Sequence, residues 1–412
     1  MKYESRLLLV TGVALAVVAT VNYAADPFGI SLAGYDSRPL ERDSFDDNTR
    51  LAKAHIVSRL RPEAIVLGTS RAEIGISPEH PAWRYRRVYN LGLPHASLHE
   101  TGEYLEHAIA AGRLQQVVIG LDFLQFNPML EPRPDFEVCR LRDPGSPWTR
   151  VRSALCDLPA LFASRAATAN SIALLWEESR DSVYLRDGSR NAAAKEALVR
   201  NAGSQHAAFL RSELEFFENT ELVRGFVVSE ARFEEVAGPE FEALLRTAHR
   251  HEVDLRLFFS PTHARHDALL FDMGLIDDYI RWKRFVVETM QRVAAEYGDA
   301  PYKVWDFSDA TRITTEELPA LDDAVSRMQW HWESSHYTRA LGDLILSHVL
   351  GNHDSAAGRR LTSENLDEWI ATVHRRHAAY REAARSELEL MRAYVRSPAK
   401  REQVDRMLQL QN

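Results

Sequence analysis

Five short apolar runs, each followed by a change of pattern, constrain the fold of this chain more than any other feature. The first, EAIVL at residues 63–67, ends at Gly68 and Thr69, which is typical of a buried parallel strand. The others are RVYNL (87–91), QQVVIGL (115–121), VDLRLFF (253–259) and YKVWDF (302–307). Because helical patterns alternate with these runs, the sequence predicts an α/β fold with a parallel five-stranded sheet.

Apolar residues at helical spacing lie between and after these runs. We expect helices at residues 97–112, 240–252, 276–298 and 337–351. Residues 128–239 are rich in Arg and Ala and predict a helical insertion between the third and fourth strands. Residues 352–412 are charged and helix-prone. They predict a C-terminal helical segment that either packs on residues 51–351 or binds a partner.

The composition is that of a globular protein. The chain has 412 residues, of which 45% are hydrophobic and 26% charged, enough for one large domain or two ordinary ones. The net charge is −9 and there is no long basic run, so a nucleic-acid partner receives no support.

The N-terminus predicts a membrane anchor at residues 1–25. Lys2 and Arg6 precede 19 uncharged residues, Leu7–Ala25, which as a helix span about 28 Å, close to a bilayer core. A cleaved signal peptide is the alternative, but Asn22 or Tyr23 would stand where small residues are preferred. Because positively charged residues that flank a span stay on the cytoplasmic side, we expect the N-terminus in the cytoplasm. Residues 26–50 would then form a tether, and the rest of the chain would lie in the periplasm, outside the inner membrane.

The chain has two cysteines, Cys139 and Cys156, 17 residues apart. In an oxidising compartment they can form one disulfide, and two buried thiols remain the alternative.

Several polar residues follow the predicted strands and should lie at one edge of the sheet. Ligands bind beyond the carboxyl ends of parallel strands, and Ser70 follows the first strand directly. It either caps the next helix or presents a hydroxyl above the sheet. Glu333 and His336 stand just before the last helix of the alternation, at the same edge. The arrangement predicts either a capping turn or the acid–base half of a hydrolase triad.

Four short motifs resemble conserved blocks of the SGNH (GDSL-like) hydrolase superfamily. They are GTSR (68–71), NLGLP (90–94), GLDFLQFN (120–127) and ESSHY (333–337). The resemblance covers residues 60–128 and 240–351, about half the chain. It implies a flavodoxin-like three-layer α/β/α sandwich that acts as an esterase, a lipase or an acyl-transfer protein of envelope polysaccharides.

The resemblance also implies roles for single residues. Ser70 matches the nucleophile, His336 the general base, and Glu333 the acid that orients it, one methylene longer than the usual Asp. The backbone N–H groups of Ser70 and Gly92 match the oxyanion hole. Thr69 replaces the usual Asp of the first block.

The third block departs from the family where an asparagine donor is expected. Asp122 stands at that position, and an ionised carboxylate only accepts hydrogen bonds. Either Asn127 supplies the donor, or the oxyanion hole has two members, or Asp122 has another role.

Further residues at the same edge are candidates for substrate binding. Trp332, like Trp330, offers an indole that could stack on a sugar ring, and His263 and His266 follow the fourth strand. With Asp267 these histidines could also ligate a metal, but no matching cluster lies nearby, so we predict no metal site. No phosphate-binding loop or dinucleotide fingerprint is present, so we predict no cofactor. The substrate-binding candidates are Arg71, His95, Asp122, His263 and Trp332.

These observations lead to one main expectation and two alternatives. The main one is a membrane-anchored serine esterase or O-acyltransferase that acts on an acylated envelope carbohydrate, with a membrane-bound acyltransferase as a possible partner. The first alternative is a non-catalytic glycan-binding or assembly protein with the same fold. The second is a phosphodiester or lipid hydrolase.

Overall fold

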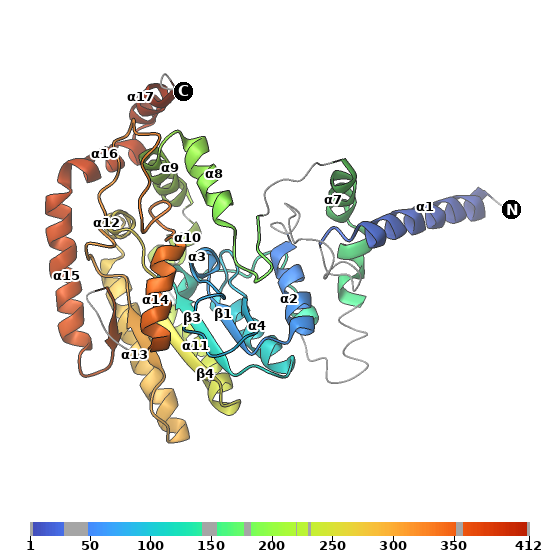
Figure 1. Cartoon of the computed structure of the whole chain (residues 1–412), viewed down its shortest axis with the longest axis horizontal. Coiled ribbons are helices and arrows are strands. Elements are labelled where there is room, and N and C mark those ends of the chain that lie inside the picture. The colour runs from blue at the N-terminus through green and yellow to red at the C-terminus, as the bar shows by residue number, and fades with distance from the viewer. Residues whose placement is uncertain are drawn as a thin grey trace.

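The computed structural model describes residues 3–28, 48–141, 155–176, 183–219, 221–229, 232–351 and 357–409. Helix α1 projects from one end of the molecule, and the last helices lie at the opposite end (Figure 1). The central α/β body lies between them (Figure 1). Most of the predicted tether, residues 29–47, falls outside the described residues.

A mixed sheet of six strands forms the centre of the body, in the order β2-β1-β3-β4-β5-β6. The first five run parallel, and β6 pairs antiparallel with β5. The five predicted parallel strands are therefore present, and a sixth, antiparallel strand that was not predicted extends the sheet at one edge. Residues 359–361 form a short edge strand with two arginines and no apolar run to reveal it. The strands are β1 Ala64–Leu67, β2 Val88–Asn90, β3 Gln116–Leu121, β4 Asp254–Phe259, β5 Lys303–Asp306 and β6 Arg359–Leu361.

Helices make up most of the remaining described chain. In the N-terminal half they are α1 Tyr3–Ala25, α2 Thr49–Leu60, α3 Ser70–Gly75, α4 Leu98–Ala110, η2 Phe123–Phe126, α5 Val138–Leu141, η3 Pro159–Ala163 and α7 Arg165–Trp176. Then follow α8 Ala192–Ala202, α9 Gln205–Glu218, α10 Glu221–Val228, α11 Phe233–Arg250, α12 Ala264–Asp272, α13 Ile276–Tyr297 and α14 Arg339–Gly351. The C-terminal helices are α15 Leu366–Ala383, α16 Arg385–Arg396 and α17 Pro398–Gln409.

The predicted helices are present, with shifted boundaries. Helix α11 begins at Phe233, inside the segment assigned to the insertion. The long C-terminal pattern breaks at Ala384 into α15 and α16. Helix α2 was not predicted. It begins at Thr49, at the end of the predicted tether, and most of it lies within the residues assigned to the α/β domain.

Both faces of the sheet are buried. Side chains alternate along each strand, so Ile65 and Leu67 of β1 point to one face and Ala64 and Val66 to the other. The first face belongs to a large core shared with α2, α4, α11 and α13. The second packs on α3 and α14. Helices therefore cover the sheet on both sides.

Helix α1 is long and apolar enough to cross a membrane. Its last turns contact η3 and α7 of the insertion, where the Asn22 amide donates to Phe162 O at 3.1 Å and to Thr168 Oγ1 at 3.1 Å. Figure 1 shows α7 beside the base of α1, apart from the sheet.

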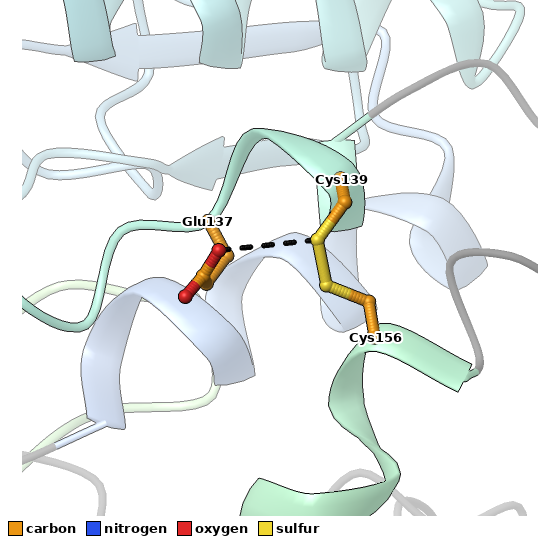
Figure 2. Close-up of side chains that lie close together, drawn as sticks. All are labelled: Glu137, Cys139 and Cys156. Carbon is orange, nitrogen blue, oxygen red and sulfur yellow. Dashed lines mark hydrogen bonds between the residues drawn. A yellow bond between two sulfur atoms is a disulfide. The ribbon is translucent and has the colours of Figure 1, made fainter.

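Cys139 and Cys156 form a disulfide, which decides between the two alternatives left open by the sequence. The bridge joins α5 to the chain just before η3, and the Glu137 carboxylate lies 3.9 Å from Cys139 Sγ (Figure 2).

Candidate functional site

Ser70 and His336 meet at the carboxyl edge of the sheet, although 266 positions separate them in the chain. Ser70 Oγ lies 2.8 Å from His336 Nε2. His336 Nδ1 contacts Glu333 Oε1 on its other side. The three side chains thus form a continuous chain from hydroxyl to imidazole to carboxylate, the order that a hydrolase triad requires.

The turn into α3 leaves the Ser70 hydroxyl available for this contact. Gly68 has φ +135°, and a Cβ there would meet Gly120 O at 2.7 Å, so the sharp turn requires glycine. Thr69, and not Ser70, is the N-cap: its Oγ1 accepts the Arg71 N–H at 3.3 Å. Ser70 is therefore the first residue of the helix, and its side chain is free of the capping role.

A glycine contact between two helices brings the distant halves of the site together. Helix α14 follows His336 and packs on α3. A Cβ at Gly342 of α14 would meet Gly75 O of α3 at 1.8 Å, so the backbones approach as closely as glycine allows. The Tyr337 ring covers Gly75 in the same contact.

The Glu333 carboxylate is buried and held by several donors. Oε2 accepts from Ser212 Oγ at 2.5 Å and from the Ser335 N–H at 2.8 Å. The Lys195 ammonium lies 3.6 Å from Oε1 and 3.4 Å from His336 Nδ1. These donors restrain the carboxylate in the position from which it orients the imidazole.

Burial and the neighbouring charges set the protonation states. Burial first and the Lys195 ammonium second lower the pKa of His336 to about 4, although Glu333 acts in the opposite direction. Burial would raise the pKa of Glu333, but His336 and Lys195 outweigh it and hold that pKa well below its usual range. At neutral pH the imidazole is therefore neutral and the carboxylate ionised, as a general base and its orienting acid should be.

Asp122 binds neighbouring side chains of the protein. Its Oδ1 accepts from Arg71 Nη1 at 2.7 Å, and its Oδ2 accepts the Thr69 hydroxyl. Arg71 Nε also donates to Ser335 O at 2.9 Å, which links the first motif to the loop that carries His336. Asp122 and Arg71 thus join the two halves of the site, and the Arg71 guanidinium neutralises the Asp122 carboxylate.

Two of the residues predicted for the oxyanion hole are placed for other contacts. The Gly92 N–H donates to Asn90 Oδ1 at 2.9 Å. Asn127 Oδ1 accepts the Met129 N–H at 3.0 Å, and Asn127 is not among the residues that line the cavity beside Ser70. Ser70 remains the predicted donor at the site, because the first N–H of a helix has no acceptor within that helix.

A cavity of about 620 Å³ opens beside the triad. Among the substrate-binding candidates, Arg71, Asp122 and His95 line it. His95 adopts φ +53°, and burial lowers the pKa of its imidazole. The cavity walls come from the GTSR and GLDFLQFN motifs, from the loop that carries Glu333, and from α8 and α9 of the insertion.

His263 and Trp332 lie outside this cavity. His263 is the N-cap of α12, where its ring accepts the Arg265 N–H, and its Nε2 contacts Glu316 O at 2.8 Å. Trp332 packs against the main core. The predictions that these two residues contact substrate therefore lack support from their positions: one is used in capping and the other in packing.

His266 of α12, the helix that His263 caps, lines the cavity. Its Nε2 lies 3.3 Å from Arg71 Nη2, and burial followed by the Arg71 charge lowers its pKa to about 3. It therefore presents a neutral ring beside Arg71.

Potential metal ligands gather at one place among the described residues, away from this site. Glu137, Cys139 and Cys156 have ligand atoms within 4.8 Å of one another. The two sulfurs are joined in the disulfide, so neither is a thiolate that could bind a metal (Figure 2).

Lys195 and Ser212 contact Glu333 from the insertion and were not among the predicted site residues. Lys195 lies in an alanine-rich helix and Ser212 in an amphipathic one, and neither belongs to a motif. Their helical faces were the only available signal, and a face does not identify what it contacts.

Comparison with known proteins adds no family to this description. No family model matches the chain, and none of the curated proteins matches it.

Proposed function

We propose that the protein is a serine esterase or O-acyltransferase related to the SGNH hydrolases. The observation that carries the proposal is the contact of Ser70 Oγ with His336 Nε2 at 2.8 Å, with Glu333 on the far side of the ring. The parallel strand order β2-β1-β3-β4-β5, with helices on both faces, supports a flavodoxin-like three-layer core extended by one antiparallel strand.

The proposed reaction is acyl transfer through Ser70. His336 Nε2 takes the hydroxyl proton as Ser70 Oγ attacks the ester carbonyl carbon, and the carbonyl oxygen becomes an oxyanion. Collapse of this intermediate breaks the bond to the leaving alcohol, which takes the proton from His336. Water or an acceptor hydroxyl then gives its proton to His336 and attacks the carbonyl carbon of the acyl–Ser70 ester. The bond to Ser70 Oγ breaks, His336 returns the proton to Ser70 Oγ, and an acid or a new ester is released.

The proposed location is the outer face of the inner membrane, with α1 as the anchor. The disulfide supports an oxidising compartment. At this location an acylated or acylatable envelope carbohydrate is the substrate, and a membrane-bound acyltransferase could supply acyl groups.

One observation favours the second candidate, a non-catalytic binding or assembly protein. The Gly92 N–H is engaged by Asn90, and Asn127 lies away from the cavity, so two predicted oxyanion donors are not directed at the site. Removal of one such donor costs about 2.7–4 kcal/mol of transition-state stabilisation in a serine protease.

Covalent labelling distinguishes the two candidates. We expect the full chain in detergent to react with a fluorophosphonate: Ser70 Oγ bonds to phosphorus, fluoride leaves, and His336 takes the proton. Peptide mass spectrometry should place the adduct on Ser70. The Ser70→Ala variant should show no adduct, and His336→Ala should react at least about 100-fold more slowly.

The control is Ser347→Ala, a serine of α14 outside the cavity, which should label as the wild type does. A folded wild-type protein without an adduct on Ser70 would favour the binding role.

A further inference from the structure

Two helices of the insertion, α8 and α9, form walls of the cavity beside Ser70. The lining residues of each helix recur at intervals of three and four positions, which places them on one helical face. From α8 these are Ala194, Ala197, Leu198, Asn201 and Ala202, together with Lys195. From α9 they are Ala208, Arg211, Ser212, Glu215 and Phe216, followed by its C-cap residue Asn219.

The α8 face is apolar apart from Lys195 and Asn201. Ala194, Ala197 and Ala202 each present only a methyl group, so the space that larger side chains would fill remains part of the cavity. Leu198 continues this surface. Leu124 and Leu130, which follow β3, and Phe216 of α9 add further apolar lining. We call these seven residues the apolar wall.

The polar groups near Ser70 are largely bonded to one another. Glu333 binds Ser212 and contacts Lys195 and His336, and Asp122 binds Arg71. The apolar wall offers no side-chain hydrogen bond to a hydroxylated ligand, because alanine, leucine and phenylalanine carry no polar atoms. The other polar lining residues of α9 and its C-cap can instead face the alcohol portion of an ester; they are Arg211, Glu215 and Asn219.

We propose that the apolar wall binds the acyl chain of the substrate, and that this chain is a hydrocarbon several carbons long rather than acetyl. The inference rests on the proposed esterase or acyltransferase function. A volume of about 620 Å³ is sufficient for a small organic ligand. Each methylene that leaves water for an apolar wall can raise kcat/KM by about fourfold.

Chain-length selectivity tests the assignment on the full chain in detergent. The rates of Ser70 phosphonylation by ethyl and octyl fluorophosphonates are compared, together with kcat/KM for p-nitrophenyl acetate and octanoate. We expect the octyl probe and the octanoate ester to be preferred by at least about tenfold.

A bulky substitution in the wall should remove this preference. Ala197→Phe, on the partly exposed part of α8, should lower the octyl-to-ethyl ratio by at least about tenfold. The matched control is Ala192→Phe, an exposed alanine of the same helix outside the cavity, which should keep the wild-type ratio. Circular dichroism checks that both variants are folded.

The outcomes separate the two proposals. Equal labelling of Ser70 by both probes, or a preference for the ethyl probe, overturns the acyl-chain assignment and leaves the serine chemistry intact. A ratio unchanged in folded Ala197→Phe also overturns it. Failure of both probes to label Ser70 in folded protein removes the proposed function, and the acyl-chain assignment with it.

Discussion

At the scale of single residues, Lys195 places a charge beside the proposed triad of Ser70, His336 and Glu333. It contributes a buried ammonium 3.6 Å from Glu333 Oε1 and 3.4 Å from His336 Nδ1. Burial lowers the pKa of Lys195 itself, while Glu333 opposes that shift. The ammonium stabilises the Glu333 carboxylate and disfavours protonation of His336, so it keeps the base neutral in weakly acidic conditions.

This arrangement predicts the pH dependence of Ser70 labelling. Because the pKa of His336 is about 4, the labelling rate should stay constant as the pH falls towards 5 and should decline only near 4. Lys195→Met removes a charge that lowers this pKa, so the decline should move to higher pH. Lys303→Met, a substitution at the start of β5, should leave the profile unchanged.

The lowered pKa of His336 also reduces the stability of the folded protein in acid. The labelling experiment must control for this effect. The unfolded chain binds a proton at His336 below about pH 6.5, whereas the folded chain does so only near 4, so stability falls over this interval. Circular dichroism at each pH shows whether the protein remains folded. A profile of Lys195→Met that coincides with the wild type in folded samples would contradict the assigned role of the ammonium.

At the scale of elements, the packing of α14 on α3 determines whether the site exists. Ser70 begins α3, and His336 stands three residues before Arg339, the first residue of α14. The contact of Gly342 with Gly75 O sets the separation of these helices, and the Arg71 bond to Ser335 O restrains the intervening loop.

A single methyl group added at this helix contact should move His336 away from Ser70. Gly342→Ala places a Cβ against Gly75 O, and relief of the clash should move α14 and His336 away from Ser70. We expect a loss of about 1–3 kcal/mol in the free energy of unfolding, as in other overpacked cores. Ser70 labelling should slow by at least about tenfold, because displacement of a catalytic group by about 1 Å can cost 100-fold.

Gly102→Ala is the matched control in α4. A Cβ there meets nothing within 4 Å, so this substitution should be neutral or stabilising by up to about 1 kcal/mol. Urea unfolding and labelling kinetics of both variants measure the difference. Wild-type labelling by Gly342→Ala would show that the helix contact does not position His336.

At the scale of the whole molecule, the structure joins a candidate membrane helix to a body with both faces of its sheet covered. Helix α1 and the C-terminal helices lie at opposite ends (Figure 1). The insertion serves both regions: η3 and α7 contact α1, while α8 and α9 line the cavity. Residues between β3 and β4 therefore contact the candidate anchor and also form part of the proposed site.

The proposed topology predicts the behaviour of reporter fusions in bacterial cells. A C-terminal alkaline phosphatase, which needs an oxidising compartment for its disulfides, should be active. The protein should sediment with membranes. Substitution of both Val13 and Leu15 by Arg should release it, because a charged residue at the centre of a spanning helix costs about 2.5–3.5 kcal/mol.

Val325→Arg is the control, at an exposed residue of the body, and should remain in the membrane fraction. An inactive phosphatase fusion beside a fluorescent cytoplasmic reporter would contradict the orientation.

The sequence alone located the five parallel strands and the helices α4, α11, α13 and α14, because buried strands and amphipathic helices carry their own periodicities. It also singled out Ser70, Glu333 and His336, since the turn after a strand and the loop before a helix are local patterns. Strand β6 was not predicted, because three residues with two arginines show no apolar run or alternation.

Only the tertiary structure decided the surroundings of these residues. Lys195, Ser212 and His266 reach the site from separate helices, and Gly92 donates its N–H to Asn90. Such contacts depend on how helices pack across large separations in sequence. Periodicity shows which face of a helix is buried, whereas the partner of that face follows from close packing of the whole core.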